Sequence, residues 1–255
     1  MEYVFGDSIT ALTQHESIVQ VEFERGPARE FALVIGADGV YSNVRRLAFA
    51  RPAGALRHLG MSGTAFTTDN YLGLDHSGLL QSGKGAASYL FSARDADRLT
   101  VSLSFATDSA DLDHRGRDEQ EQAVRTAFAG QGWEAPRLLE KMAQAPDYYF
   151  ASTCQVELDN WSHDRVTLVG DAGYCAAPTS GMGTSQALIG ARVLARQLAA
   201  SGDHQAAFVA YERELRPYVN ENQENGREAA KMFGAQDVVL TSTQVEPPDC
   251  PHGLF

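Results

Sequence analysis

Residues 166–198 read VTLVGDAGYCAAPTSGMGTSQALIGARVLARQL, and this stretch decides the expected fold. The segment 166–169 is typical of a short buried strand, and the Ala and Leu spacing predicts a helix over 184–200. The connection between them is rich in Gly, Pro and Ser. Because ligands bind at the carboxyl ends of strands in open α/β sheets, this connection is the first candidate for a binding site.

The start of the connection carries an acid and two glycines. Asp171 directly follows the strand, so we expect its carboxylate at the rim of a sheet. There it can accept hydrogen bonds from the vicinal hydroxyls of a ribose or ribityl chain. Gly170 and Gly173 let the backbone turn and approach a ligand closely. The alternative is an ordinary strand–loop–helix crossover in which the glycines serve packing.

The end of the connection opens a helix. Pro178 leads to Gly181, Met182 and Gly183, which immediately precede the predicted helix. Unpaired N–H groups at a helix start favour negative charge. The N1–C2=O edge of an isoalloxazine ring becomes anionic on reduction, so these amides suit a flavin.

A second strand also ends in an acid. The stretch LVIGADGVYSNVRR at 33–46 places Asp38 and Gly39 after an apolar run, and Ser42 is positioned to cap a short helix. Asp38 is suited to orient backbone amides or an arginine near a pyrophosphate. Arg45 is suited to bind a phosphate through two N–H groups. The alternative is a simple Asp-Gly turn followed by a solvent-exposed Arg45.

Together the two stretches resemble the "DG" and "GD" motifs of the flavin-dependent monooxygenases related to p-hydroxybenzoate hydroxylase. The resemblance extends from about residue 8 to 233 and includes the YERELRPYVNENQ helix. It implies FAD as cofactor, NAD(P)H as reductant, and the transfer of one oxygen atom to an aromatic or polyketide-like small molecule. It also implies that FAD is bound by residues of both motifs: Asp38, Gly39, Arg45, Gly170, Asp171, Pro178, Gly181, Met182 and Gly183.

The rest of the chain fits the same family pattern. The expected fold is mixed α/β: a partial Rossmann-like FAD/NAD(P)-binding domain, an inserted antiparallel-sheet substrate domain, and C-terminal helices. We assign 1–52 and 147–233 to the FAD-binding part, 53–146 to the substrate part and 234–255 to a poorly ordered tail. Strands are predicted at 8–14, 18–24, 30–35 and 148–158, and in four segments between 54 and 107. Helices are predicted at 117–130, at 135–144 and over 203–233 with an interruption at Pro217.

Three departures from the family pattern stand out. No GxGxxG occurs in the chain, although family members carry one in an N-terminal βαβ unit. We therefore expect either an incomplete chain or a second chain that supplies the unit. The alternative is a non-redox binding or auxiliary protein on the same scaffold. Many family members also have a His where Tyr174 stands and an acid where Gly190 stands.

Composition excludes some classes of function. The formal net charge of −12 argues against a nucleic-acid partner, and no apolar run is long enough to span a membrane. Because no signal peptide is visible, we expect a cytoplasmic protein with reduced cysteines and no metal site. No catalytic acid or base is singled out. His58, His76 and His114 are more typical of surface or core positions, and Tyr71, Tyr89 and Phe91 of a strand core, than of a site.

Overall fold

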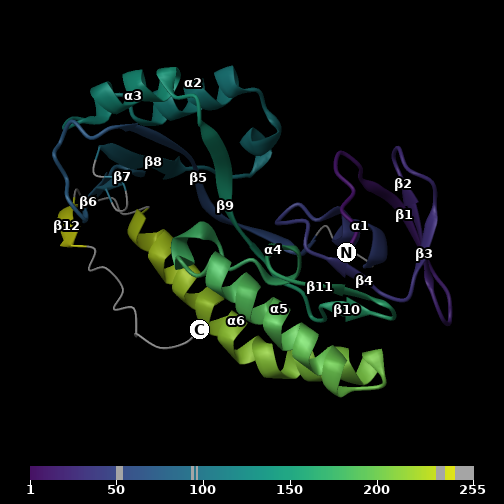
Figure 1. Cartoon of the computed structure of the whole chain (residues 1–255). Helices are drawn as coiled ribbons and strands as arrows, with labels where there is room; N and C mark the ends of the chain where they lie inside the picture. Colours follow the sequence, from purple (N-terminus) through teal and green to yellow (C-terminus); the bar gives the residue numbers. More distant parts are fainter. Residues whose placement is uncertain (50–53, 93–94, 96, 234–238, 245–255) are drawn as a thin grey trace. The chain divides into compact units, whose positions relative to one another are not determined.

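Figure 1 shows a computed structural model of the chain, which describes residues 1–49, 54–92, 95, 97–233 and 239–244. The chain divides into two compact units. The first comprises Met1–Leu59 and Cys154–Glu228, and the second comprises Gly60–Thr153 and Ala229–Phe255.

The first unit begins with a three-stranded antiparallel sheet. Its strands are β1 (Ile9–Gln14), β2 (Val19–Phe23) and β3 (Arg29–Phe31). In β2, Val19 and Val21 are buried while the polar residues between and after them are exposed. This alternation is the pattern of a strand with one buried face. The strands predicted at 8–14 and 18–24 are therefore confirmed.

A second sheet in the same unit has the order β10-β11-β4. It consists of β10 (Ser162–His163), β11 (Val166–Leu168) and β4 (Val34–Gly36), and β11 and β4 run parallel. The prediction of a single strand over 30–35 is wrong, because the chain bends between β3 and β4. The bend allows the N–H of Val34 to bond to the carbonyl of Arg165 at 3.0 Å, which moves β4 into the second sheet.

Helices complete the first unit. They are α1 (Asn43–Ala48), α4 (Asp171–Tyr174), the 3-10 helix η3 (Pro178–Ser180), α5 (Gly183–Ala200) and α6 (His204–Phe233). The predicted interruption of α6 at Pro217 is wrong, because the helix continues through it. A proline removes one backbone hydrogen bond and crowds the preceding turn. Leu215 and Val219 are each 2% exposed, so packing on both sides of the proline holds α6 together.

The second unit contains a six-stranded sheet with the order β12-β6-β7-β8-β5-β9. Its strands are β5 (Leu56–Asp69), β6 (Ser77–Gly83), β7 (Ala86–Ser92), β8 (Arg98–Ala106), β9 (Tyr149–Val156) and β12 (Val239–Gln244). The helical elements are η2 (Asp111–His114), α2 (Arg117–Ala127) and α3 (Ala135–Gln144). The strands and helices predicted between 54 and 158 are therefore confirmed.

The two faces of this sheet differ. Along β8, Leu99, Val101, Leu103 and Phe105 are buried in a core with residues of α2 and α3, whereas the residues between them are half-buried. The prediction of a poorly ordered tail over 234–255 is wrong for residues 239–244, which form β12 and pair with β6. The other residues of the predicted tail lie outside the described part of the chain. In the described part of the chain, no helix has the length and apolar character needed to cross a membrane.

Candidate functional site

The parallel pairing of β4 and β11 brings the two predicted motifs together. Gly36 at the end of β4 lies opposite Leu168 at the end of β11. The N–H of Val169 then donates to the carbonyl of Gly36 at 2.9 Å. The loop that contains Asp38 and the loop that contains Asp171 therefore leave the sheet at the same edge, as expected for the carboxyl ends of parallel strands.

A cavity of about 450 Å³ lies between these loops and the start of α5. This volume is within the range of about 300–1,000 Å³ that is typical of small-molecule pockets. Four predicted residues line it, namely Gly39, Gly170, Asp171 and Gly183. The other lining residues are Ala37, Val169, Thr184, Ala187, Leu188 and Ala191. The side chains that line the cavity beside Asp171 are thus mostly small or apolar.

The Asp38 carboxylate accepts hydrogen bonds from neighbouring groups of the protein itself. One carboxylate oxygen accepts from the hydroxyl of Ser42 at 2.5 Å, and the other accepts from the N–H groups of Asn43 and Val44 at 2.7 and 2.9 Å. Ser42 in turn caps α1 by accepting from the N–H of Arg45 at 3.0 Å. Asp38 therefore orients the first turn of α1.

Arg45 is buried and connects the two loops. Its guanidinium donates to the carbonyl of Ala172 and to the carbonyl of Val40, both at 2.7 Å. The residue is 5% exposed, so the alternative of a solvent-exposed helix residue is wrong. Burial lowers the pKa of Arg45, and the charge of Asp38 acts in the opposite direction. Among the described residues, the Nε atom has no hydrogen-bond partner.

The Asp171 loop is packed against α5. Gly170 has a φ of +65°, a conformation that favours glycine. A side chain there would also place its Cβ 3.2 Å from the Cβ of Ala187. Asp171 follows as the first residue of α4 and is half-buried at the cavity. The glycine therefore allows the close approach that brings Asp171 beside the start of α5.

The amides at the start of α5 divide into two groups. The N–H of Gly181 donates to the carbonyl of Pro178, and the N–H of Met182 donates to the hydroxyl of Ser180, both at 3.1 Å. Two of the three predicted amides are thus used inside the loop. Among the described residues, no side chain caps α5. Its first N–H groups, on Gly183 and Thr184, therefore remain available at the cavity.

The loop before α5 has a strained backbone. Ala177 has φ +71° and ψ +151°, a region that is almost restricted to glycine. Pro178, which follows, is exposed. The hydroxyl of Thr179 donates to the carbonyl of Gly226 on α6 at 2.7 Å. A Cβ on Gly226 would lie 2.3 Å from the carbonyl oxygen of Ala176, so the contact between this loop and α6 depends on that glycine.

Two buried glutamines support the same loop. Gln155 donates to the carbonyls of Ala176 and Gln223, and Gln223 donates to those of Val156 and Cys175. Neither glutamine is predicted as part of the site, because a single glutamine in a strand or a polar helix gives no signal of burial. Thr184, Ala187, Leu188 and Ala191 are not predicted as lining residues either, although all four lie on the predicted helix at intervals of about one turn.

Tyr174 and Gly190, which depart from the family pattern, are in contact. The hydroxyl of Tyr174 would lie 2.0 Å from a Cβ on Gly190. Tyr174 is fully buried, and its ring packs against Trp161 at an angle of 49° with the centroids 4.5 Å apart. Its hydroxyl accepts a 2.9 Å hydrogen bond from the hydroxyl of Tyr211. Burial raises the pKa of Tyr174, so this hydroxyl stays protonated.

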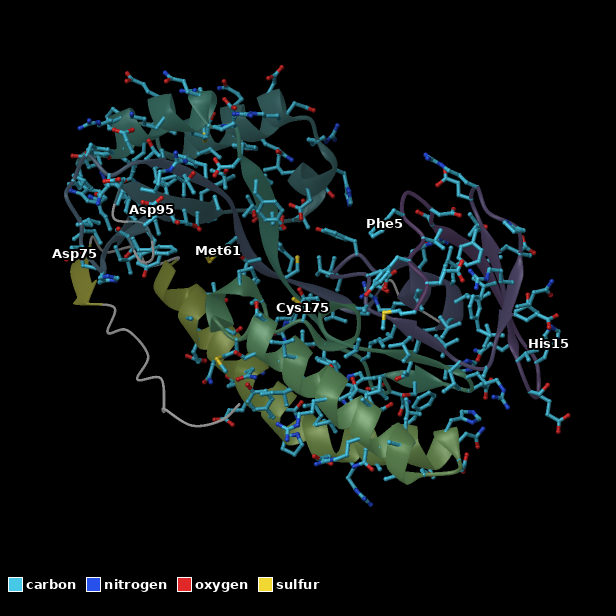
Figure 2. All side chains as sticks on the ribbon, in the orientation of Figure 1. Phe5, His15, Met61, Asp75, Asp95 and Cys175 are labelled. Carbon is cyan, nitrogen blue, oxygen red and sulfur yellow. The ribbon has the colours of Figure 1, made fainter. Side chains whose placement is uncertain are left out.

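Cys175 lies in the first unit and is labelled in Figure 2. It is 7% exposed, and its thiol contacts the carbonyl of Cys154 at 3.5 Å. Burial, followed by the nearby charge of Asp171, raises the pKa of Cys175 to about 12. The thiol is therefore protonated at neutral pH and acts as a small buried side chain.

The aromatic residues of the second unit fall on different faces of its sheet. Tyr89 and Phe91 stack with ring centroids 5.3 Å apart, and they pair in register with Ser102 and Thr100 on the half-buried face of β8. Tyr71 packs against the core on the other face, where Arg137 lies 3.5 Å from its ring centroid. In the described part, no cluster of His, Cys, Asp and Glu side chains has the arrangement of a metal site.

Comparison with known proteins agrees with this geometry. The model of the "FAD binding domain" family matches residues 2–225. An uncharacterized protein of Mycobacterium tuberculosis is 42% identical over 224 residues, which cover 88% of this chain and 60% of that protein. A flavin-dependent monooxygenase of an unknown prokaryotic organism is 38% identical over 242 residues, which cover 95% and 63%.

A solved structure gives the same result. The crystal structure of the tetracycline destructase Tet(55) matches with a TM-score of 0.80 and 38% identity, covering 91% of this chain and 62% of that one. The chain thus spans about three fifths of the length of these relatives. From the family match and the shared fold, the chain belongs to the FAD-binding family of flavin-dependent monooxygenases.

Proposed function

We propose that this chain provides the flavin-binding and substrate-binding parts of an FAD-dependent monooxygenase. One observation carries the proposal: residues of both motifs and the uncapped start of α5 line a single cavity. When bound, FAD supplies NAD(P)H-driven oxygen chemistry, which leads to hydroxylation or epoxidation of a small molecule. We expect the enzyme in the cytoplasm, where NAD(P)H is available.

The cavity has the chemical features that FAD requires. Asp171 offers carboxylate oxygens for the hydroxyls of the ribityl chain. The N–H groups of Gly183 and Thr184 offer fixed donors for the N1–C2=O edge of the ring. A Cβ on Gly39 or Gly183 would meet no atom within 4 Å, so both glycines leave space that a side chain would occupy.

The substrate class is proposed from the second unit. Tyr89 and Phe91 form an aromatic pair on the sheet face opposite α2 and α3, beside the hydroxyls of Ser102 and Thr100. Flat aromatic surface flanked by hydroxyl groups suits a planar substrate with polar substituents. An aromatic or polyketide-like small molecule has these properties, and the relative named for tetracycline supports this class. We accordingly propose that 53–146 is the substrate part and that 1–52 with 147–233 is the FAD part.

The edge of β4 supports a further strand. In the described part of the sheet, β4 pairs only with β11, and Ile35 at its centre is 47% exposed. An open strand edge with an apolar side chain tends to pair with another strand. We propose that a parallel strand from a GxGxxG-containing segment pairs here, either within a longer chain or from a second chain.

Binding of FAD to the purified chain tests the proposal. We expect saturable quenching of flavin fluorescence, with higher affinity when a GxGxxG-containing segment from a family member is co-expressed. If neither preparation bound FAD at high micromolar concentration, the proposal would be wrong.

A further inference from the structure

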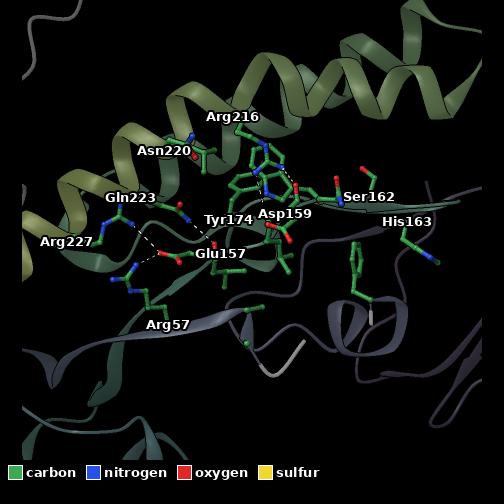
Figure 3. A pocket seen from close by; sticks show the side chains of 18 residues that line it. Arg57, Glu157, Asp159, Ser162, His163, Tyr174, Arg216, Asn220, Gln223 and Arg227 are labelled. Carbon is green, nitrogen blue, oxygen red and sulfur yellow. Dashed lines mark hydrogen bonds and ion pairs between the residues drawn. The ribbon is translucent and has the colours of Figure 1, made fainter. Parts of the chain in front are cut away.

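A second cavity in the first unit, larger than the proposed flavin site, lies apart from it. It has a volume of about 890 Å³ and shares no lining residue with the flavin cavity. Figure 3 shows its walls, which come from α6, from the segment 156–163 and from residues before and at the start of β5. It is of the size of a small-molecule site, and the proposed function does not use it.

Cationic side chains outnumber acidic ones in this cavity. Arg57, Arg216 and Arg227 line it, together with the two acids Glu157 and Asp159. The whole chain has a formal net charge of −12. Arg216 and Arg227 are also ion-paired with Glu212 and Glu224, which do not line the cavity. An anion would therefore be drawn by a guanidinium that has unused donors rather than by a net positive charge.

Two of the three arginines are already fully engaged. Arg216 donates to the carbonyls of Leu158 and Asp159 and to the carboxylate of Glu212, and its guanidinium lies 4.3 Å from the ring centroid of Trp161. Arg227 donates to Gln155, Glu157 and Glu224. These two residues therefore shape the cavity wall.

The guanidinium of Arg57 has N–H donors that no described residue uses. Among the described residues, its guanidinium makes a single hydrogen bond, which is a 3.0 Å contact with Glu157, and its side chain is 53% exposed. A guanidinium has five N–H donors in a planar fork. Figure 3 shows Arg57 and Arg227 converging on Glu157. Because Arg227 also bonds to Glu157 at 3.2 Å, Arg57 can turn toward a ligand while Glu157 keeps a partner.

We propose that this cavity binds a small organic anion through Arg57. A carboxylate or phosphate group matches the guanidinium fork and accepts two parallel hydrogen bonds. Apolar atoms of Phe49, Ala55 and Val219 line the same space and suit an organic ring. Asn220, an exposed residue of α6, provides an amide for a polar substituent.

Fluorescence of Trp161 provides a direct readout. The chain has two tryptophans, of which Trp161 lines the cavity and Trp133 does not. In a Trp133→Phe variant, all tryptophan emission comes from Trp161. We would titrate this variant with benzoate and, as a neutral molecule of similar shape, with benzamide, at constant ionic strength and neutral pH. Inorganic phosphate would serve as a competitor that has charge but no ring.

The expected result is a saturable change in emission with benzoate, at least about tenfold weaker affinity for benzamide, and displacement by phosphate. Arg57→Gln in the same background should weaken benzoate binding about tenfold or more, since it removes a charge-assisted pair. Arg29→Gln is the matched control, because Arg29 is a similarly exposed arginine paired with one acid, Glu2. It should leave the titration unchanged.

Three results would overturn the proposal. They are an absence of saturation with benzoate, equal affinity for benzamide, and unchanged benzoate affinity in Arg57→Gln. Circular dichroism would establish that Arg57→Gln is folded. If it were not, Arg57→Lys would replace it; a lysine keeps the charge but not the fork, so benzoate affinity should fall by a smaller factor. Unchanged benzoate affinity in Arg57→Lys would likewise contradict the assignment.

Discussion

The two loops at the carboxyl ends of β4 and β11 lie side by side but use their polar groups in opposite ways. In the first loop, Asp38 accepts three hydrogen bonds from Ser42, Asn43 and Val44, and Arg45 donates to two carbonyls. In the second loop, Asp171 and the amides at the start of α5 face a cavity. Asp38 and Asp171 thus occupy similar places in the sequence but have different surroundings, which the sequence pattern does not distinguish.

The largest expected effect comes from removing the buried connection between the loops. Arg45→Met leaves the carbonyls of Ala172 and Val40 without their donors. We expect the free energy of unfolding to fall by about 3 kcal/mol, because buried carbonyls would lose charged partners. Urea unfolding followed by circular dichroism measures this value. Arg46→Met is the control, because Arg46 is exposed and its side chain bonds only to Asn43, one turn earlier on the same helix, among the described residues. Equal losses in both variants would contradict the connecting role of Arg45.

The second largest effect is expected on FAD affinity, from a substitution in the second loop. Asp171→Ala should weaken FAD binding about tenfold or more, since hydrogen bonds to a charged group contribute about 1.5–3 kcal/mol. The measurement is a fluorescence titration in the form of the protein that binds FAD best. Asp75→Ala, at an exposed loop position, should not change the affinity. Unchanged affinity in Asp171→Ala would remove this residue from the proposed site.

The matching substitution in the first loop, at Asp38, should lower the stability of the protein more than its FAD affinity. Asp38→Ala removes three hydrogen bonds that orient the first turn of α1. We expect a loss of about 1–2 kcal/mol in the free energy of unfolding, as for the removal of a helix cap. FAD affinity, measured where the variant is fully folded, should change less than in Asp171→Ala. A larger loss of affinity than in Asp171→Ala would show that the first loop binds the cofactor directly.

The smallest effect concerns strain in the second loop. Ala177 has a positive φ in a region that only glycine adopts readily. Ala177→Gly should therefore raise the free energy of unfolding by about 1 kcal/mol. The gain should appear as a higher midpoint in urea. If Ala177→Gly instead lowered the free energy of unfolding, the buried methyl group of Ala177 would contribute more stability than the strained backbone costs.

Periodicity and turn residues were sufficient to predict most of the fold. Alternation in β2 and β8 reports on each strand and on its buried face. The Ala and Leu spacing predicts the helix α5 but not its buried face, which is formed by Gln186, Gly190, Val193 and Leu194. The errors arose where tertiary contacts decide. The bond from Val34 to Arg165 separates β3 from β4, and packing of Leu215 and Val219 carries α6 through Pro217.

The candidate site was also predictable only where its residues belong to a local sequence pattern. Asp171, Gly170 and Gly183 were found because a strand end followed by a glycine-containing loop and a helix has a local sequence pattern. The burial of Arg45 depends on the carbonyl of Ala172, more than a hundred residues away in the chain. Gln155 likewise bonds to α6, through Gln223. No local pattern in a single sequence contains that information.

The contact between Tyr174 and Gly190 also constrains the order in which the two positions can evolve. Any side chain at 190 would overlap the hydroxyl of Tyr174, which has a buried partner in Tyr211. A mutation to an acid at 190 is therefore blocked while the tyrosine remains. A change from Tyr174 to a shorter residue such as His opens the space first, at the cost of a cavity beside Trp161. A side chain at position 190 accordingly requires a shorter residue at position 174.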